Sequence, residues 1–470
     1  MLSRRSILKH FATGLLATFT PYFAQTSQCA IAQTAPSDRL RIGCIGLGNR
    51  GAGNTYEFSG LGDVVALCDI DSGYAPVVAA RGNPRLGSGP EKNRTAPDFY
   101  DDYRRLLDRN DIDIVCIGTP DHWHTKLTME ALDASKHVFC EKPLTLTLEE
   151  NQRVRAAAER SNRVVQVGSQ QRIMRDQFII AALLVQKGAI GRIKRVVCDV
   201  GPGPVCDPLP VVEPPETFLW DRWLGQAPMT DYIGGGKFFD GRWELSRSHR
   251  VFRYFYDYSG GTVTDWGAHH LDSALMALGL QTRGTGPYRI DGRNVEMAVR
   301  FENGYPTETN RFNTPKTFDI VFSFDSKTGS EYLTDDCRLH LVSDSADGNG
   351  ILFEGENGRF HVNRDRIKGK VIEELGAKPY SDDECRTLNK GKPFESHKQN
   401  FIRAIREGGL PASDVETHTL AMNCCHLAGI AARLGREIEW DPVTERIVGD
   451  DQAASFAARS PRPGYELPMI

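Results

Sequence analysis

The 470-residue chain lacks several features that would assign it to particular classes of protein. It contains no uninterrupted apolar run of about 20 residues, the length that a helix needs to cross a bilayer, so we expect no stable membrane insertion. It has no basic stripe or arginine-rich arm and its net charge is −4, so nucleic acid is not an expected partner. It has no internal repeat, and it is too long for one ordinary core, which predicts two domains.

Cysteine motifs that bind metals or exchange disulfides are absent as well. The chain contains 11 cysteines but no Cys-x-x-Cys pair. Cys44, Cys68, Cys116 and Cys140 each lie inside a strand-like apolar run. We therefore expect mostly free, buried thiols rather than a disulfide framework.

Residues 1–32 are predicted to be an export signal. The stretch "SRRSILKH" places twin arginines before a modest apolar run, and a small-residue site follows at 30–32. This order resembles the twin-arginine export signal, which implies cleavage after residue 32 and a periplasmic protein. A lipid anchor on Cys29 is not expected, because Gln28 is a poor neighbour for that processing.

Short apolar runs alternate with helix-compatible segments as far as residue 168. The runs are "RIGCIG", "DVVALCD", "DIDIVCIGTP", "KHVFCEKP" and "RVVQVG", and this alternation predicts a parallel sheet covered on both faces. Beyond Gly168, "TFDIVFSFD" and "GILFEGENGRFHVNRD" alternate with a period of two, and Glu-Asn-Gly is typical of a hairpin turn. The second half is therefore predicted to be an α+β domain with a large, mostly antiparallel sheet.

A glycine-rich turn follows the first predicted strand. "IGLGNRG" gives Gly46-x-Gly48-x-x-Gly51 between a strand and a helix pattern, which is typical of a dinucleotide-binding domain. Gly46 makes the tight turn, Gly48 lets the pyrophosphate approach, and Gly51 lets the helix pack on the strand. Asp69 ends the next strand and is expected to bind a ribose diol, which favours NAD. Arg50 could meet a 2′-phosphate, so NADP stays an alternative.

Two more segments end neighbouring strands at the same edge of the predicted sheet. "TPDHWHT" follows the third strand, and Glu-Lys-Pro at 141–143 follows the fourth, where open α/β sheets bind ligands. Two histidines one residue apart, with no further ligand nearby, do not favour a metal site. The predicted cofactor-binding residues are Gly46, Gly48, Asn49, Arg50, Gly51, Asp69, Thr119, Pro120, His122, Trp123, His124, Glu141 and Lys142.

These motifs, with "GGTVTDWGAHHLDSALMALG", resemble the glucose–fructose oxidoreductase/inositol dehydrogenase/rhizopine catabolism (Gfo/Idh/MocA) family over nearly all of the chain beyond the signal. The resemblance implies an NAD(P)-binding Rossmann-type domain at 39–168 and an α+β substrate domain at 169–435. Residues 436–470 are assigned to a C-terminal tail. Because members of the family commonly associate through the open sheet, a homo-oligomer is expected.

The same resemblance implies a catalytic group. Oxidation of a secondary alcohol needs a base of near-neutral pKa, which points to histidine. Asp265 and His269 lie four residues apart and would share one helix face; an ordinary helix pair is the alternative reading. In the family, His269 would be the general base, Lys142 would donate to the alcohol oxygen and Asp265 would orient both. The predicted substrate-binding residues are Gln170, Arg172 and His270.

The sequence therefore predicts an exported NAD(P)-dependent oxidoreductase acting on a secondary alcohol of a sugar, polyol or glycoside. The periplasm offers no free nicotinamide pool, so the cofactor is expected to be tightly held. The leader, the "HWH" motif and the fold also resemble NAD-dependent glycosidases of glycoside hydrolase family 109. A redox-neutral glycosidase or lyase with a 3-keto sugar intermediate is therefore the alternative. That group commonly lacks the lysine of Glu-Lys-Pro, so Lys142 favours the dehydrogenase.

Overall fold

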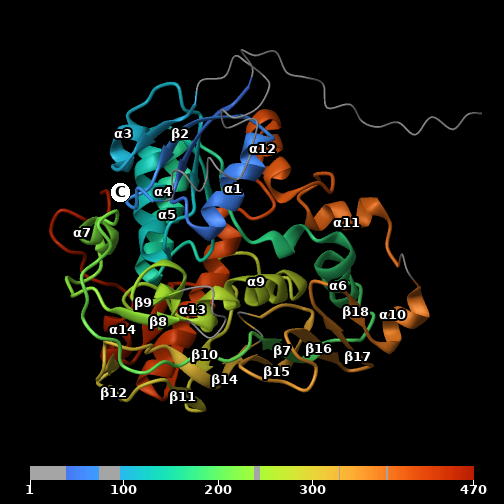
Figure 1. Ribbon diagram of the computed structural model, residues 1–470. Coiled ribbons are helices and arrows are strands. Elements are labelled where there is room, and N and C mark those ends of the chain that lie inside the picture. The colour runs from blue at the N-terminus through green and yellow to red at the C-terminus, as the bar shows by residue number, and fades with distance from the viewer. Residues whose placement is uncertain are drawn as a thin grey trace, which may run out of the picture. The chain divides into compact units, whose positions relative to one another are not determined.

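The computed structural model describes residues 39–73, 96–237, 244–325, 327, 329–376 and 379–469. The segment from Leu40 to the C-terminus packs as one compact unit (Figure 1). The predicted export signal lies outside the described residues, as do residues 74–95.

The first half forms the predicted parallel sheet. Its strand order is β3-β2-β1-β4-β5-β6, and every neighbouring pair is parallel. The five predicted strands are confirmed. The edge strand β3 was not predicted, because it has only three residues and no buried apolar run. The strands are β1 (Arg41–Ile45), β2 (Asp63–Cys68), β3 (Asp98–Tyr100), β4 (Ile114–Ile117), β5 (His137–Cys140) and β6 (Val165–Val167).

Helices connect these strands and cover both faces of the sheet. Strands β4 and β5 are almost wholly buried, as expected for central strands of a parallel sheet. α5 begins where the Thr147 side chain accepts from the backbone N–H of Glu150, and it ends at Asn162, whose φ is 51°. The helices are α1 (Asn49–Ser59), α3 (Tyr103–Leu107), α4 (His124–Asp133) and α5 (Leu148–Ser161).

One helix from the far end of the chain completes this layer. Figure 1 shows α12 (His397–Glu407) beside α1, and the ring of Phe401 packs edge-on against Phe58 (6.3 Å) and Phe139 (6.0 Å). The apolar face of α12 thus belongs to the core of the first sheet, although α12 lies within the 169–435 segment assigned to the second domain.

The second half is built on a ten-stranded sheet with the order β18-β17-β16-β7-β15-β14-β10-β19-β20, and β11 pairs with β14 off this path. Only β7 and β15 pair in parallel. The predicted hairpin turn at 356–358 joins β16 to β17. The strands are β7 (Ile193–Asp199), β10 (Arg289–Asp291), β11 (Val295–Met297), β14 (Pro315–Ser323), β15 (Leu333–Val342), β16 (Gly350–Gly355), β17 (Arg359–Val362), β18 (Ile367–Lys368), β19 (Glu437–Asp441) and β20 (Arg446–Val448).

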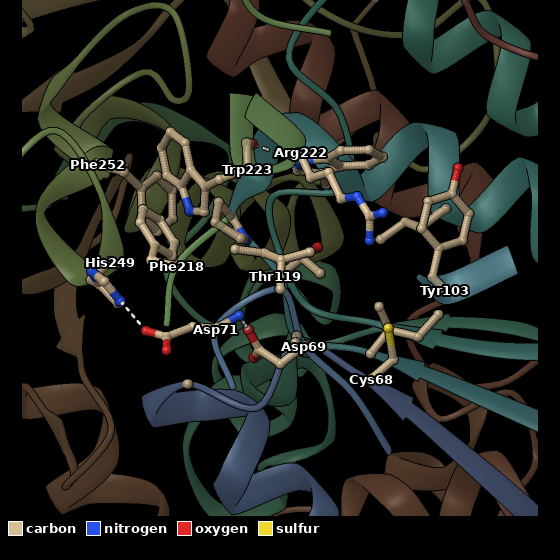
Figure 2. Close-up of a pocket in the computed structure, with 18 of the residues that line it drawn as sticks. Cys68, Asp69, Asp71, Tyr103, Thr119, Phe218, Arg222, Trp223, His249 and Phe252 are labelled. Atoms are coloured by element: carbon tan, nitrogen blue, oxygen red, sulfur yellow. Dashed lines mark hydrogen bonds and ion pairs between the residues drawn. The ribbon is translucent and has the colours of Figure 1, made fainter. Parts of the chain in front are cut away.

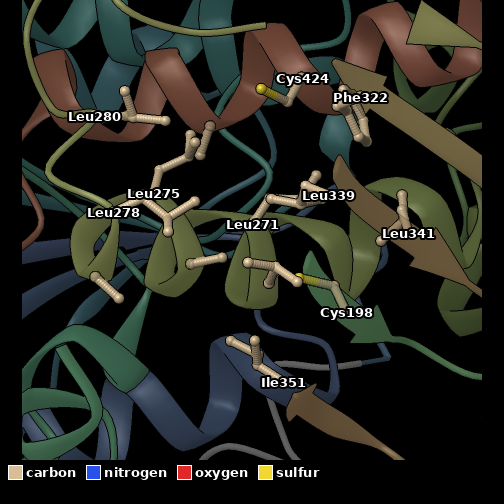
Figure 3. Close-up of a cluster of buried hydrophobic side chains, with 14 of the residues drawn as sticks. Cys198, Leu271, Leu275, Leu278, Leu280, Phe322, Leu339, Leu341, Ile351 and Cys424 are labelled. Atoms are coloured by element: carbon tan, nitrogen blue, oxygen red, sulfur yellow. The ribbon is translucent and has the colours of Figure 1, made fainter. Parts of the chain in front are cut away.

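Helices α9 (Gly267–Ala277) and α13 (Val415–Leu434) form the core with this sheet. Figure 3 shows α9, with Leu271 and Leu275, below α13, which carries Cys424, and the strand residues Leu339 and Leu341 to the right. Strands β19 and β20 lie within the 436–470 segment that the sequence assigned to a tail, and they are the last strands of the sheet. Further elements are α6 (Ile180–Gln186), α10 (Lys370–Leu375), α11 (Asp382–Leu388) and α14 (Asp451–Ser455).

Residues 201–237 and 244–261 are largely irregular and form an aromatic core of their own. Their regular parts are helix α7 (Trp220–Leu224), the antiparallel strands β8 (Gly234–Lys237) and β9 (Glu244–Ser246), and a 3-10 helix at 249–254. The buried members of this core include Phe218, Trp223, Phe252 and Tyr258. This irregular segment packs on the end of β2, because Ser72 N–H donates to the carbonyl of Thr217 at 3.0 Å.

The ten described cysteines are all free, and only Cys206 is not fully buried. This confirms, for that part of the chain, the expectation of unpaired buried thiols. Among the described residues, no helix is both long and apolar enough to cross a membrane.

Candidate active site

The glycine-rich turn after β1 has the geometry of a phosphate-binding loop. Gly46 has φ of 81°, and a Cβ added there would lie 2.6 Å from the backbone nitrogen of Thr119. A Cβ on Gly51 would lie 1.9 Å from the carbonyl oxygen of Gly46, so helix and turn can touch only without side chains. Gly48 precedes α1 and no side chain caps the helix, which leaves its first N–H groups available to an anion.

Asp69 follows the last residue of β2 at the same edge. Its carboxylate accepts from the N–H of Leu47 at 2.6 Å and from the N–H of Asp71 at 2.9 Å. Burial raises the pKa of Asp69 to about 6, although these two hydrogen bonds oppose the shift. Each carboxylate oxygen keeps a second lone pair, which suits the ribose diol for which this residue was predicted.

The Arg50 guanidinium, considered as a contact for a 2′-phosphate, already has partners within the protein. Its Nε donates to Glu141 Oε1 at 2.9 Å, and its Nη1 lies 3.4 Å from Glu57 Oε1. With its amide oriented to satisfy both neighbours, Gln170 accepts from Arg50 Nη2 at 2.9 Å and donates to the carbonyl of Gly168 at 2.7 Å. Gln170, predicted to bind substrate, therefore holds the arginine of the glycine loop.

A cavity opens along this edge of the sheet (Figure 2). Of the predicted cofactor residues, those that line it are Gly46, Gly48, Asn49, Arg50, Asp69, Thr119, Pro120 and Trp123. Gly51 lies behind the turn, and His122, His124, Glu141 and Lys142 are not part of the lining. The hydroxyl of Thr119 is buried and has no hydrogen-bond partner within the described parts of the chain, so it can serve a ligand.

The opposite wall of the cavity comes from the irregular segment, which the sequence did not place there. Figure 2 shows Phe218, Trp223, His249 and Phe252 facing the strand edge, and His249 Nε2 lies 3.3 Å from the Asp71 carboxylate. Tyr465, near the C-terminus, also lines the cavity. The only sequence signal for this wall was the density of aromatic residues between 218 and 258.

His122 belongs to the core rather than to the cofactor site, which corrects its prediction. It is fully buried, and its Nε2 donates to the carbonyl of Trp223 at 2.8 Å. Burial lowers the pKa of His122 to about 3, so the imidazole is neutral. Trp123 donates from its indole nitrogen to the same carbonyl at 2.9 Å, and thereby anchors α7 to the first domain.

His124 ties two loops of the site together. Its Nδ1 is 2.6 Å from the carbonyl oxygen of Pro143, and its Nε2 is 2.9 Å from that of Thr119. Both partners are acceptors, so both ring nitrogens donate and the ring is an imidazolium. Burial alone would lower its pKa, but Cys140, Asp121 and the Pro143 carbonyl outweigh it and raise the pKa of His124 to about 9. His124 therefore acts on the loops and not directly on a ligand.

The loop after β5 brings Lys142 to the junction of the two halves. The Lys142–Pro143 peptide bond is cis, and the N–H of Leu144 donates to His418 Nε2 at 3.4 Å. The Lys142 ammonium donates to the backbone carbonyl of Asp265 at 2.8 Å and also to the Asp265 carboxylate. The predicted pairing of Lys142 with Asp265 is thus present across the interdomain junction.

The Asp265 carboxylate has a second cationic partner that the sequence did not reveal. Arg253 donates from its Nε at 3.3 Å to the same carboxylate oxygen that faces Lys142, and Arg253 also lines the cavity. Burial would raise the pKa of Asp265, but the charges of Lys142 and Arg253 hold it well below its usual range. Asp265 is therefore a carboxylate at neutral pH.

His269 and Asp265 lie on two consecutive helices rather than on one. Asp265 ends α8 (Thr262–Asp265) and His269 is the third residue of α9, so the single helix face expected for the pair is interrupted at Trp266. The imidazole is 5% exposed, and its Nδ1 has no hydrogen-bond partner in the described part of the chain. Burial and the nearby charge of Lys142 hold the pKa of His269 well below its usual value. The imidazole is therefore neutral and can accept a proton from a bound alcohol, but in the structure without ligand it is a weaker base than the near-neutral one expected from the sequence.

Two predicted substrate contacts lie in the protein core instead. Arg172 is 2% exposed, pairs with Asp272 at 2.7 Å and donates to the carbonyl of Ala412 at 3.0 Å. His270 is 1% exposed and its ring lies 5.4 Å from that of Trp266. The buried contacts of Arg172 hold its side chain in the core. His270 Nε2 lies 3.4 Å from Asn349 Oδ1, and its Nδ1 has no hydrogen-bond partner among the described residues, so its substrate role stays a prediction. Among the described residues, no group of three or more His, Cys, Asp or Glu side chains could hold a metal ion.

Comparison with known families agrees with this architecture. Residues 40–169 match the Gfo/Idh/MocA model described as an oxidoreductase family with an NAD-binding Rossmann fold. Residues 206–296 match the model of the C-terminal alpha/beta domain of that oxidoreductase family.

Relatives of known name resemble the chain in part. A "Glycosyl hydrolase family 109 protein" of Shewanella sp. (strain W3-18-1) is 34% identical over 181 residues, which is 36% of this chain and 37% of the relative. One of Shewanella pealeana is 30% identical over 210 residues, 41% of this chain and 44% of the relative. The matched stretch thus spans less than half the length of either relative.

Solved structures share the fold at low sequence identity. The aldose-aldose oxidoreductase of Caulobacter crescentus, complexed with glycerol, has a TM-score of 0.53 at 18% identity, covering 85% of this chain and 99% of its own. The WlbA dehydrogenase of Bordetella pertussis, in complex with NADH and UDP-GlcNAcA, has a TM-score of 0.54 at 16% identity. The match covers 85% of this chain and 98% of that structure's chain. These likenesses establish the two-domain fold.

Proposed function

Because the chain carries the NAD-binding Rossmann domain and the C-terminal domain of the Gfo/Idh/MocA oxidoreductases, we propose that it oxidises a secondary alcohol of a sugar, polyol or glycoside. The observation that carries the proposal is the bond from Lys142 to Asp265 beside the unpartnered imidazole of His269. Bound NAD would supply the hydride acceptor, held by the glycine turn and Asp69.

Each member of the group has a task that its surroundings suit. The Lys142 ammonium donates to the substrate oxygen and stabilises the alkoxide as its proton leaves. His269, neutral because of burial and the neighbouring ammonium, takes that proton. Asp265 fixes the ammonium and offsets its charge together with that of Arg253.

The test begins with the purified protein and its released cofactor. Mass spectrometry identifies the nucleotide, and a panel of sugars and polyols is then screened for reduction of the bound cofactor. We expect NAD and a sugar-dependent rise in reduced nicotinamide. A protein that releases NADP would overturn the NAD preference, and one that carries NAD but oxidises no alcohol would overturn the dehydrogenase.

We also propose that the protein works outside the cytoplasm with its cofactor retained. The twin-arginine order at Arg4 and Arg5 motivates the export, and the wall of the cavity supports the retention. Tyr465 lines the cavity, and Arg462 pins this end of the chain to α7 through Asp221 at 2.7 Å and the Gly225 carbonyl at 2.8 Å. Replacing Arg4 and Arg5 by lysine should leave the protein in the cytoplasm, and unchanged export would exclude this route.

A redox-neutral glycosidase is the second candidate, because relatives named glycosyl hydrolase family 109 match a third of the chain. Oxidation at C3 would acidify the C2 proton, elimination would release the C1 substituent, and water addition with re-reduction would complete cleavage. Release of nitrophenol from nitrophenyl glycosides, without net reduction of the cofactor and without a free ketosugar, would favour this candidate. Lys142 favours the dehydrogenase, since the lysine is commonly absent from that group.

The expected homo-oligomer belongs to the same proposal. We place the contact on the face of the ten-stranded sheet opposite α9 and α13, where Val197, Val342 and Leu352 form a small apolar cluster of their own. Light scattering should give a mass above that of one chain, and Val342→Glu should lower it. A monomer at micromolar concentration would contradict the proposal.

A further inference from the structure

Arg364 is a cation beside the catalytic group that the function proposed above does not use. It lies in the turn between β17 and β18, and it is exposed. Its guanidinium lies 4.7 Å from the centre of the ring of Trp266, the residue that follows Asp265. Within the described ranges, no acidic side chain forms an ion pair with it.

A short chain of hydrogen bonds connects Arg364 to His269. With its amide oriented to satisfy both neighbours, buried Gln171 accepts from Arg364 Nε at 3.2 Å and donates to the backbone carbonyl of His269 at 3.0 Å. One edge of the guanidinium is thereby fixed, and stacking on Trp266 fixes its plane. The guanidinium keeps further N–H groups for which the described residues provide no carboxylate.

The balance of charge around His269 favours an anion. The Asp265 carboxylate pairs with both Lys142 and Arg253. One negative charge thus faces two positive charges, and Arg364 adds a third positive charge nearby. Arg364 is close enough to lower the pKa values of His269 and His270, for which burial is the larger cause. Burial is also the larger cause of the lowered pKa of Arg364; the charge of Asp265 opposes this shift and that of Arg50 adds to it. An oxyanion on the substrate would offset this excess of positive charge.

We propose that Arg364 recognises an oxyanion substituent of the substrate, so that the preferred substrates are acidic sugars. The proposal rests on the function proposed above. The substituent is a carboxylate, a sulfate ester or a phosphate ester near the hydroxyl that His269 deprotonates. A planar guanidinium held along one edge and stacked on an indole presents its remaining N–H groups to such an oxyanion, in the paired geometry that arginine favours.

The experiment compares matched neutral and acidic sugars on the holoprotein. Glucose and galactose are each set against the corresponding uronic acid, 6-sulfate and 6-phosphate, and the initial rate of cofactor reduction gives kcat/KM. Arg364→Gln removes the charge, and Arg366→Gln, an exposed arginine of the same turn, is the matched control. Calorimetric titration of the same ligands gives binding independently of turnover.

We expect one class of acidic sugar to exceed its neutral partner by at least about tenfold in kcat/KM. Arg364→Gln should raise KM for that acid about 10- to 100-fold, the range for a hydrogen bond between charged groups, and leave the neutral sugar unchanged. Arg366→Gln should change neither. The acidic sugar whose KM rises in Arg364→Gln identifies the substituent as a carboxylate, a sulfate ester or a phosphate ester.

Three results would overturn the inference. The first is equal kcat/KM for neutral and acidic sugars, or equal loss for both in Arg364→Gln; the oxidoreductase would stand without acid recognition. The second is loss of bound NAD from Arg364→Gln, which would assign the arginine to the cofactor. The third is calorimetric binding of acidic sugars that Arg364→Gln leaves unchanged. If no sugar of either kind is oxidised, the proposed function fails, and the titrations still decide whether Arg364 binds the anion.

Discussion

The ammonium of Lys142 donates to the backbone carbonyl of Asp265 at 2.8 Å and to its carboxylate, and this contact joins residues 123 positions apart. Lys142 comes from the loop after β5 and Asp265 from the end of α8, so the two domains meet at a charged pair. His269 is the neutral partner beside this pair.

The first prediction concerns the catalytic group. Lys142→Met and His269→Ala should each lower kcat by at least about 10²–10⁴-fold, the usual cost of losing a positioned acid or base. Because the groups act as one unit, the double variant should lose little more than the worse single one. Steady-state kinetics measure this. His340→Ala, on β15 and paired with Asp319, is the control and should retain normal rates.

The second prediction concerns Asp69 and pH. Its pKa is about 6 without ligand, and ribose hydroxyls that donate to the carboxylate favour the ionised form. NAD affinity should therefore be full above pH 6 and fall by up to about tenfold per pH unit below it. Cofactor retention during filtration at a series of pH values measures this.

Asp69→Asn should bind NAD more weakly and lose the pH slope. Asp69→Ala should weaken NAD more than NADP, because it removes both an acceptor for the ribose and a charge that repels a 2′-phosphate. An unchanged slope in Asp69→Asn would mean that another group controls binding.

The third prediction concerns His124 and stability. Its pKa in the fold, about 9, exceeds the ordinary value of 6.5, so the folded protein holds this proton more tightly than the unfolded chain. The stabilisation is fully present below pH 6.5 and is lost as pH rises to about 9. The difference of 2.5 units between the folded and ordinary pKa values corresponds to at most about 3 kcal/mol in the free energy of unfolding.

The wild-type thermal midpoint should therefore fall more steeply between pH 6.5 and 9 than that of His124→Gln. His124→Gln should also lower kcat with NAD still bound, since Thr119 and Pro143 lose their common partner. If the thermal midpoints of the two proteins change equally with pH across this range, His124 is not protonated in the folded protein.

The fourth prediction concerns the C-terminal segment that closes the nucleotide cavity. Arg462→Gln removes contacts to Asp221 and Gly225, so Tyr465 should leave the cavity more readily and bound NAD should dissociate at least about tenfold faster. Dilution with excess labelled NAD measures the exchange. Arg300→Gln, an arginine on the surface of the second domain, is the control and should exchange at the wild-type rate.

The features that could be predicted were those encoded by local sequence. Gly46 and Gly51 mark the nucleotide turn because each closes a contact that no Cβ would permit. The parallel arrangement of the first sheet follows from the alternation of strands and helices, whereas its strand order does not. Lys142 and Asp265 were paired only through the family resemblance, since nothing in their spacing implies contact.

The rest depends on packing between distant segments. Phe218 and Arg253 come from an irregular segment without a period, so no pattern indicated that they would form the wall opposite β2. Arg172 follows β6 as a ligand-binding residue would, and only the buried Asp272 explains why it turns into the core. The break at Trp266 likewise depends on its surroundings in the fold.

The absorbance of reduced nicotinamide in the purified holoprotein, after addition of acidic and neutral sugars, tests the central claim most directly. The account predicts a rise with at least one sugar for the wild-type protein, and none on that time scale for Lys142→Met or His269→Ala with NAD still bound. A His269→Ala protein that reduces its cofactor at near the wild-type rate would contradict it.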